Sequence, residues 1–297
     1  MITKSAGIER SHHVVAASDA ARQMAEQIAV AARSPLPAAF AGPTGSGKKH
    51  AARAVHNLSS AADGPFETFS ARGVEPHAHA QHLFGSQPST ETQGHVGAAA
   101  GGSLLIDGFD QLAAAARSQL LDLLKKQSAP TRAQAPTRVL LTSTTEVDLP
   151  DITIQNVRVH PLSERPECIL PLAAHFLAIF ASHEDVEPVG FTSDARRSLL
   201  EEAWAGNIRE LRERIRHAVR LAGSGAISAE ALLLANEGDE VLPFKQAKRA
   251  FETRYVESLL RRCRGNISRA ARLAQKDRKD FYDVIRRTGV DPSQFRN

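Results

Sequence analysis

The chain has 297 residues, of which 42% are hydrophobic and 24% charged, an ordinary composition for a globular protein with enough sequence to bury a core. Its two cysteines are too few for a disulfide framework or a cysteine-based zinc site, and we expect neither a secretory leader nor an apolar run of the ~18 residues that a membrane span needs. The net charge of +4 hides an asymmetry, because residues 244–297 hold 15 Lys and Arg against 6 Asp and Glu, and the preceding residues hold 22 against 27. A basic tail on an acidic body suggests a nucleic-acid-binding module joined to a different domain in a cytoplasmic protein.

The first motif with chemical content begins after a short apolar run, Leu36–Ala41, that predicts a buried strand. A glycine-rich turn follows, and then a segment with apolar residues at helical spacing. This order is the context of a phosphate-binding P-loop, in which backbone N–H groups and a helix N-terminus stabilise phosphate charge, and the alternative is a turn without a ligand. Lys48 is expected to reach the β- and γ-phosphates, whereas Lys49 stands where the pattern has the Ser or Thr that holds Mg²⁺. The residues predicted to bind ATP or ADP here are Gly42, Pro43, Thr44, Gly45, Ser46, Gly47, Lys48 and Lys49.

Two further stretches carry potential metal ligands. The apolar run 101–107 predicts a strand that ends in Asp107, whose carboxylate would act on the Mg²⁺ of a bound nucleotide or would cap a following helix. The next residue is Gly108, and Asp110 is expected to point elsewhere. The spacing of His77, His79 and His82 also suits a metal, but an exposed loop is the favoured interpretation because the sequence places no carboxylate or cysteine beside them.

The basic tail has the pattern of a helix-turn-helix. An amphipathic helix is predicted from Phe244 to Cys263, with an apolar face that includes Tyr255. A short helix over Ser268–Gln275 and a second over Arg278–Thr288 follow, and Phe281, Val284 and Ile285 are expected to face inward. The second helix would enter a major groove of double-stranded DNA by its N-terminal residues, while a solvated basic face is the alternative. Arg278 and Lys279 would contact guanine edges or phosphates, and Arg269 and Arg272 would hold phosphates. The full predicted DNA-binding set is Arg269, Arg272, Arg278, Lys279, Tyr282, Asp283, Arg286 and Arg287.

With these segments in this order, the chain resembles the AAA+ central domain of bacterial sigma-54-dependent activators followed by their Fis-type DNA-binding domain. The resemblance rests on segments 42–59, 65–66, 82–85, 99–112 (AAGGSLLIDGFDQL), 160–181 and 203–219 (AWAGNIRELRERIRHAV), with the tail 242–290. It implies an α/β P-loop domain with a parallel sheet at 1–165, a helical lid at 166–236 and an all-α helix-turn-helix domain at 237–297. It also implies that Arg209 points from the lid toward the γ-phosphate, and that the helix before the helix-turn-helix packs against its copy in a dimer or, alternatively, onto the lid.

The departures from the family pattern bear on function. The stretch 86–102 lacks the GAFTGA sequence that contacts the sigma factor, and Gly108 replaces the Glu that polarises the attacking water. Thr144 or Thr145 stands at the sensor I Asn, and Arg158 cannot be equated with an arginine finger. A general base contributes about 10²–10⁴ in rate and an arginine finger about 10³–10⁵, so losing both predicts little or no ATP hydrolysis.

The sequence therefore predicts a DNA-binding transcriptional regulator, a homo-oligomer without a membrane partner, that binds ATP or ADP with or without Mg²⁺. One alternative is an active ATPase that remodels sigma-54 RNA polymerase, with Asp110 or a partner subunit supplying catalysis. Another is a subunit that co-assembles with an intact family member and modulates its ATPase ring.

Overall fold

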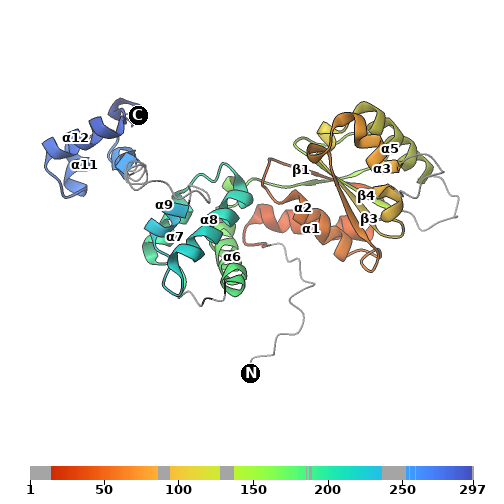
Figure 1. Ribbon diagram of the computed structural model, residues 1–297, viewed down its shortest axis with the longest axis horizontal. Helices are drawn as coiled ribbons and strands as arrows, with labels where there is room; N and C mark the ends of the chain where they lie inside the picture. Colours follow the sequence, from red (N-terminus) through yellow and green to blue (C-terminus); the bar gives the residue numbers. More distant parts are fainter. Residues whose placement is uncertain are drawn as a thin grey trace, which may run out of the picture. The chain divides into compact units, whose positions relative to one another are not determined.

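The computed structural model describes residues 15–85, 94–127, 137–184, 186, 189–235, 252–253, 255–257 and 259–295. The chain forms two compact units. The first comprises Met1–His175 and Leu199–Arg212, and the second comprises Phe176–Ser198 and Glu213–Asn297. Figure 1 shows their helices and strands.

The first unit is built on a five-stranded parallel sheet with the strand order β2-β3-β4-β1-β5, as the predicted α/β class requires. Helices α1 and α2 lie on one side of the sheet and α3 and α5 on the other (Figure 1). Its elements are α1 (Asp19–Arg33), β1 (Ala38–Ala41), α2 (Lys48–Asn57), β2 (Phe66–Ser70), η1 (Ala71–Gly73), η2 (Pro76–Ala78), α3 (His79–Phe84), α4 (His95–Ala98), β3 (Ser103–Asp107), η3 (Phe109–Gln111), α5 (Ala114–Gln127), β4 (Arg138–Ser143), β5 (Gln155–Arg158), η4 (Leu162–Glu164) and η5 (Pro166–Cys168).

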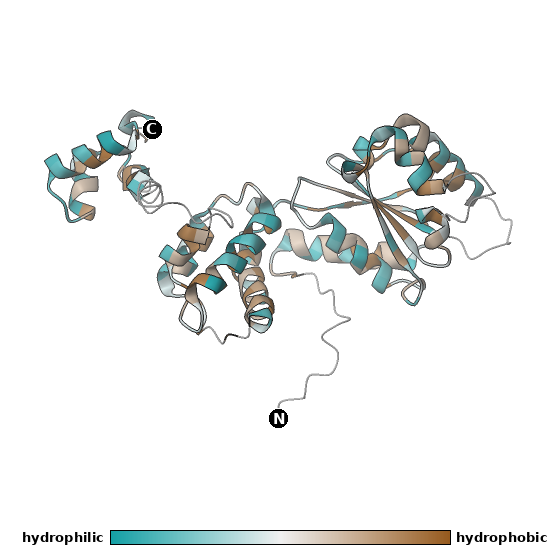
Figure 2. Ribbon diagram, in the orientation of Figure 1, coloured by the Kyte–Doolittle hydropathy of each residue, from teal (hydrophilic) through white to brown (hydrophobic). Residues whose placement is uncertain are grey.

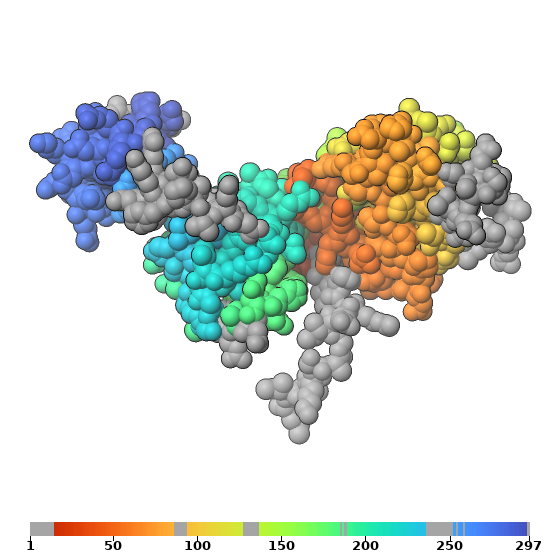
Figure 3. Space-filling model, viewed as in Figure 1, coloured from red at the N-terminus to blue at the C-terminus, as the bar shows by residue number. Residues whose placement is uncertain are grey.

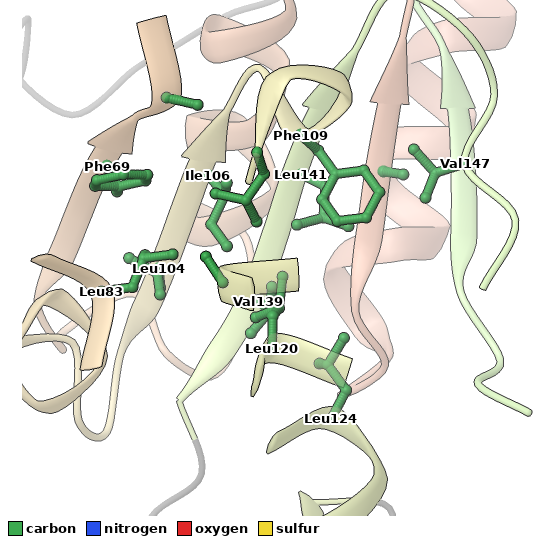
Figure 4. Packing of buried hydrophobic residues seen from close by; sticks show 14 of the residues in the cluster. Phe69, Leu83, Leu104, Ile106, Phe109, Leu120, Leu124, Val139, Leu141 and Val147 are labelled. Atoms are coloured by element: carbon green, nitrogen blue, oxygen red, sulfur yellow. The ribbon is translucent and has the colours of Figure 1, made fainter. Parts of the chain in front are cut away.

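Both faces of the sheet are buried, so its central strands are nearly continuous apolar runs, brown in Figure 2. Because side chains alternate along a strand, Leu104 and Ile106 of β3 pack on the side of α3 and α5, with Leu120 among their neighbours (Figure 4). Leu105 points to the opposite side and packs in the cluster that contains Val55 of α2. These two cores fix the sheet between its helices.

The parallel strands bring their carboxyl ends to one edge of the sheet, where ligands bind in open α/β folds. Ala41 at the end of β1 is in register with Ser143 at the end of β4. Asp107 at the end of β3 is in register with Thr142 of β4. The predicted P-loop and the predicted terminal carboxylate therefore lie at the same edge.

The remaining helices before the basic tail follow the sheet in the sequence. Helices α6, α7 and α8 each contribute residues to both units. In the second unit, an isolated parallel bridge joins Phe191 to Ile227, and Arg220 pairs with Glu184 at 2.8 Å. The elements are α6 (Ile169–His183), α7 (Ser193–Glu201), α8 (Asn207–Ala222) and α9 (Ala229–Leu234).

The expectation that the chain has no apolar stretch long enough for a membrane span is wrong. Among the described residues, the helical segment Pro166–His183 is long and apolar enough to cross a membrane by length and composition, with a mean hydropathy of 1.2. A core helix of a folded domain has the same composition. Its buried large residues recur at three- or four-residue steps, the pattern of a helix with one face against a protein core; they are Ile169, Leu172, Phe176 and Phe180.

Near the C-terminus, α11 (Ile267–Leu273) and α12 (Arg278–Thr288) pack on the helical residues that precede them, with η7 (Pro292–Phe295) after them. These residues form one lobe, blue in Figure 3. The Asn266 side chain caps α11 by accepting from Arg269 N, and Gln275 takes the left-handed conformation (φ 51°) in the turn. The core consists of Val256, Leu259, Leu260, Cys263, Ala270, Ala271, Phe281 and Ile285.

The predicted inward residues of α12 are confirmed, because Phe281 and Ile285 are buried and Val284 is partly buried against the same core. The predicted face of the preceding helix is wrong at Tyr255, which is 42% exposed. Leu259, the other described residue of the predicted face, does lie in the core, together with Val256 and Leu260. The other predicted positions between residues 244 and 251 lie outside the described residues.

Candidate functional site

The P-loop turn depends on glycine at two positions. Gly45 has φ 80° and Gly47 has φ 105°, a region that favours glycine because other residues carry a Cβ that clashes there. A Cβ on Gly45 would also lie 2.1 Å from the Gly206 carbonyl oxygen. Helix α2 then begins at Lys48 with Gly47 at its N-cap, so its first N–H groups face the turn.

Residues far away in the sequence hold this turn in place. The Asn207 side chain donates to Thr44 O at 3.1 Å and accepts from Leu162 N at 2.8 Å. The buried Arg165 guanidinium donates to Ser46 O at 2.6 Å. Sequence reasoning missed both residues, although Asn207 lies in the GNIREL segment that it singled out.

The turn forms one side of a cavity of about 390 Å³, within the usual size range of small-molecule sites. Five cationic side chains and two carboxylates line it, which suits an anionic ligand. Of the predicted site residues, Gly42, Pro43 and Ser46 do not line the cavity, and Ser46 is buried. The lining residues are Thr44, Gly45, Gly47, Lys48, Lys49, His50, Arg72, Asp107, Gly108, Asp110, Thr142, Ser143, Thr144, Ile208, Arg209 and Arg212.

The two lysines at the start of α2 have different partners. Lys48 Nζ donates to Gly42 O at 2.6 Å and to Pro43 O at 2.8 Å. Burial lowers the pKa of Lys48, although the nearby Asp107 opposes the shift. Lys49 Nζ lies 2.9 Å from Asp107 Oδ2, an ion pair between residues 58 positions apart that the sequence did not predict.

Asp107 accepts hydrogen bonds on both carboxylate oxygens. Thr142 Oγ1 donates to Oδ1 at 2.7 Å and itself accepts from Gly108 N at 3.0 Å. Ser70 Oγ donates to Oδ2 at 3.4 Å. Burial alone would raise the pKa of Asp107, but hydrogen bonds from Lys49 and Thr142 outweigh it and hold the pKa below its ordinary value. Asp107 does not cap the next turn, because the N-cap of η3 is Gly108.

The expectation that Asp110 points elsewhere is wrong. Gly108 has φ 82°, and the η3 turn that follows returns Asp110 to the cavity wall. Its Oδ2 accepts from Thr144 Oγ1 at 2.9 Å. Of the two candidates for the sensor I position, Thr144 lines the cavity and Thr145 does not.

The other singled-out side chains lie apart from the cavity lining. Arg158 pairs with Glu164 at 3.5 Å. His79 is buried in α3 rather than in an exposed loop: its Nε2 faces Ala71 O and Val74 O, and its Nδ1 accepts from Ala113 N at 3.1 Å. The described residues contain no group of three His, Cys, Asp or Glu that could hold a metal ion.

In the second unit, α12 presents a basic surface. Arg287 is bonded to Glu252 through Nε at 3.1 Å and NH2 at 2.8 Å. Among the described residues, Arg278 and Lys279 at the start of the helix have no ion pair. All eight residues of the predicted DNA-binding set are exposed: Arg269, Arg272, Arg278, Lys279, Tyr282, Asp283, Arg286 and Arg287.

Two family models match adjacent parts of the chain: the sigma-54 interaction domain matches residues 14–159 and the AAA+ ATPase lid domain matches residues 163–241. The chain belongs to the sigma-54 interaction domain family. Membership confirms the predicted AAA+ P-loop fold with its parallel sheet and helical lid. It also places the chain among sigma-54-dependent transcriptional regulators.

Relatives of this family resemble the chain over most of its length. The transcriptional regulatory protein GlrR of Escherichia coli (strain K12) is 28% identical, over 95% of this chain and 69% of GlrR. The sigma54-dependent transcriptional activator SfnR of Pseudomonas putida is 28% identical, over 82% of this chain and 70% of SfnR. Structures of NtrX from Brucella abortus in complex with ATP and with ADP have TM-scores of 0.65 and 0.67, with 26% and 25% identity over 95% and 94% of this chain and 70% of each NtrX chain.

Against the family pattern, the exchange of the catalytic Glu for Gly108 has a structural counterpart. A side chain at φ 82° is strained, so the backbone here has a conformation that a Glu would rarely adopt.

Proposed function

We propose that the chain is a DNA-binding transcriptional regulator whose AAA+ site binds ATP or ADP and hydrolyses ATP slowly or not at all. The observation that carries the nucleotide part is the cavity at the P-loop, lined by Lys48, Lys49, Arg72, Arg209 and Arg212. These cations suit a di- or triphosphate, and the NtrX relative has been solved with ATP and with ADP. Arg209, as the family pattern implies, would contact the γ-phosphate.

Efficient hydrolysis requires a group that activates water and a cation that stabilises the transferred phosphoryl group. Gly108 offers no side chain at the position of the family's Glu, and Arg158 is paired with Glu164. A missing general base and a missing arginine finger each lower the rate by orders of magnitude, about 10²–10⁴ and 10³–10⁵. Binding depends on other groups, namely the loop backbone and Lys48, and these are retained.

One experiment separates binding from turnover. We expect titration of the whole chain with ADP and ATP to show binding that Lys48→Ala weakens, because the loop ammonium would contact the phosphates. Lys126→Ala removes a lysine from the exposed face of α5 and serves as the control. Phosphate release at saturating ATP should stay near the rate without protein. Turnover well above that background would contradict the proposal, as would equal binding by the Lys48→Ala variant and the wild type.

The position of Asp110 favours a second candidate, an active ATPase that remodels sigma-54 RNA polymerase. Its carboxylate lines the cavity and is oriented by Thr144, which is where a general base would act on a water molecule. Asp110→Asn keeps the side chain's shape and removes its basicity. If the wild type hydrolyses ATP and Asp110→Asn abolishes the hydrolysis without weakening ADP binding, this candidate replaces the first.

The DNA-binding part rests on the exposed basic surface of α11 and α12. In this proposal residues 237–297 form a Fis-type helix-turn-helix domain, 166–236 the lid and 1–165 the α/β subdomain. The proposed partners are double-stranded DNA, a second copy of the chain and RNA polymerase, in the cytoplasm of a bacterial cell. Mapping the chain's binding sites across the genome tests this: enrichment at specific sequences supports it, and the absence of enriched sites contradicts it.

A further inference from the structure

The Lys49–Asp107 ion pair lies where a P-loop protein would hold its magnesium ion. In the P-loop pattern the residue after the lysine is Ser or Thr, whose hydroxyl binds Mg²⁺, and the carboxylate at the end of the neighbouring strand acts on the same ion. Here the first position is Lys49 and the second is Asp107, and their side chains are joined at 2.9 Å. Compared with the general P-loop pattern, one substitution thus removes the hydroxyl ligand and gives the carboxylate a cationic partner.

The chemistry of these residues does not fit Mg²⁺. Magnesium requires oxygen ligands in near-octahedral geometry at about 2.0–2.1 Å. Lys49 offers three N–H donors and no lone pair, and its positive charge would repel a cation at the same carboxylate. Asp107 Oδ1 already accepts from Thr142, and Oδ2 accepts from Lys49 and Ser70.

The cavity also has positive charge of its own for a polyphosphate. Besides Lys49, four cations line it, namely Lys48, Arg72, Arg209 and Arg212, against Asp107 and Asp110. The Lys49 side chain is 55% exposed, so a phosphate oxygen can approach the ammonium while it remains beside Asp107. A fixed ammonium there provides charge and hydrogen-bond donors at the place where a divalent ion would bridge phosphate and carboxylate.

We infer that the Lys49 ammonium takes the place of Mg²⁺, so that this chain binds ADP and ATP without a divalent cation. The inference rests on the proposed nucleotide binding, and it specifies that the bound form is the metal-free nucleotide. In free solution Mg²⁺ neutralises part of the phosphate charge, and the cations of the cavity then gain less from binding. Added Mg²⁺ should accordingly leave the affinity unchanged or lower it.

The test measures ADP affinity of the whole chain by calorimetry, once in EDTA and once in excess Mg²⁺. ADP is chosen because it is not hydrolysed by an ATPase reaction. Two variants form a matched pair: Lys49→Thr restores the hydroxyl and releases Asp107 for a metal, whereas Lys49→Arg keeps the cation. We expect wild type and Lys49→Arg to bind ADP in EDTA at least as tightly as in Mg²⁺. Lys49→Thr should bind at least about tenfold more tightly in Mg²⁺ than in EDTA.

Paramagnetic Mn²⁺ gives a second reading that does not depend on affinity. With ADP bound, Lys49→Thr should hold Mn²⁺ against the protein and broaden proton resonances of residues near Asp107, whereas the wild type should not. If the wild type binds ADP only in Mg²⁺, or tenfold more tightly there, the inference is wrong while the nucleotide site stands. If no nucleotide binds in either medium, the proposed nucleotide site fails and the inference fails with it.

Discussion

Helices α2 and α12 both begin with two consecutive basic residues, yet their surroundings differ. At α2, Lys48 donates to two loop carbonyls and Lys49 pairs with Asp107. At α12, Arg278 and Lys279 are exposed and have no ion pair among the described residues. The same sequence feature thus gives a prearranged pocket in one place and an open surface in the other.

The difference matters because a cation at a helix N-terminus is unfavourable on its own, by about 0.3–1 kcal/mol at exposed sites. At α2 the protein offsets that repulsion internally with carbonyl and carboxylate oxygens, and the charges are fixed for a small anion. At α12 the described residues give these two side chains no ion pair, although Asp277 and Asp280 lie in the same turn. In the proposed function the backbone phosphates of DNA would supply the partner charge. We therefore expect substitutions at α2 to act on a local ligand and those at α12 to act on an extended polyanion with strong salt dependence.

The largest expected effect tests the open surface. Arg278→Ala combined with Lys279→Ala should lower affinity for a mapped DNA site about 10²–10⁴-fold, because each good base-edge contact contributes about 1–3 kcal/mol. If both residues contact phosphates rather than base edges, the slope of log affinity against log salt should become shallower by roughly 2. Fluorescence anisotropy at several salt concentrations measures both quantities.

The control for this double variant is Lys125→Ala combined with Lys126→Ala in α5, which removes the same charge from the first unit. It should leave the DNA affinity close to that of the wild type. Equal losses in the two double variants would show that net charge, and not the surface of α12, determines binding.

The next largest effect tests how the pocket is held. Asn207 is buried, has φ 57°, and bonds both Thr44 and Leu162. Asn207→Gly keeps the backbone freedom and removes the amide, which leaves the buried Leu162 N–H unpaired and the Thr44 carbonyl without its donor. We expect a loss of about 1–3 kcal/mol in the free energy of unfolding, measured by urea denaturation, together with weaker ADP binding.

Asn207→Ala should lower the free energy of unfolding by roughly 1 kcal/mol more than Asn207→Gly, because alanine disfavours the left-handed backbone conformation. A comparison of the two variants separates the hydrogen bonds from the conformation. A Gly variant as stable as the wild type would mean that the bonds from Asn207 to the loop contribute nothing to its position.

Local patterns predicted much of this molecule. The predicted second helix, Arg278–Thr288, agrees with the structure at both ends, and the run ending at Asp107 forms β3. The helix has a complete periodic pattern and the strand is a continuous apolar run, and each has a clear end signal. The resemblance predicted the lid and the placement of Arg209, which lines the cavity.

What sequence reasoning missed depends on contacts between distant residues. Lys49 was recognised as a departure, but its partner is set by the adjacency of α2 and β3 in the fold. The bond from Asn207 to Thr44 spans 163 positions. Asp110 was misplaced for a different reason: the left-handed Gly108 reverses the chain direction, and no periodicity signals such a turn.

The smallest expected effect concerns Arg287, a basic residue of α12 that already has a partner within the protein. Glu252 binds Arg287 by two hydrogen bonds and is largely buried, with 19% of its side chain exposed. Glu252→Gln should lower the free energy of unfolding by about 0.5–1 kcal/mol and at the same time release Arg287 toward a phosphate. DNA affinity should then rise and the salt slope should steepen by roughly one unit.

Glu257→Gln removes the same charge without touching Arg287, so an equal rise in affinity for both variants would mean that Arg287 makes no contact of its own. If only Glu252→Gln lowers the stability and raises the DNA affinity, Arg287 is a DNA contact that its ion pair with Glu252 weakens.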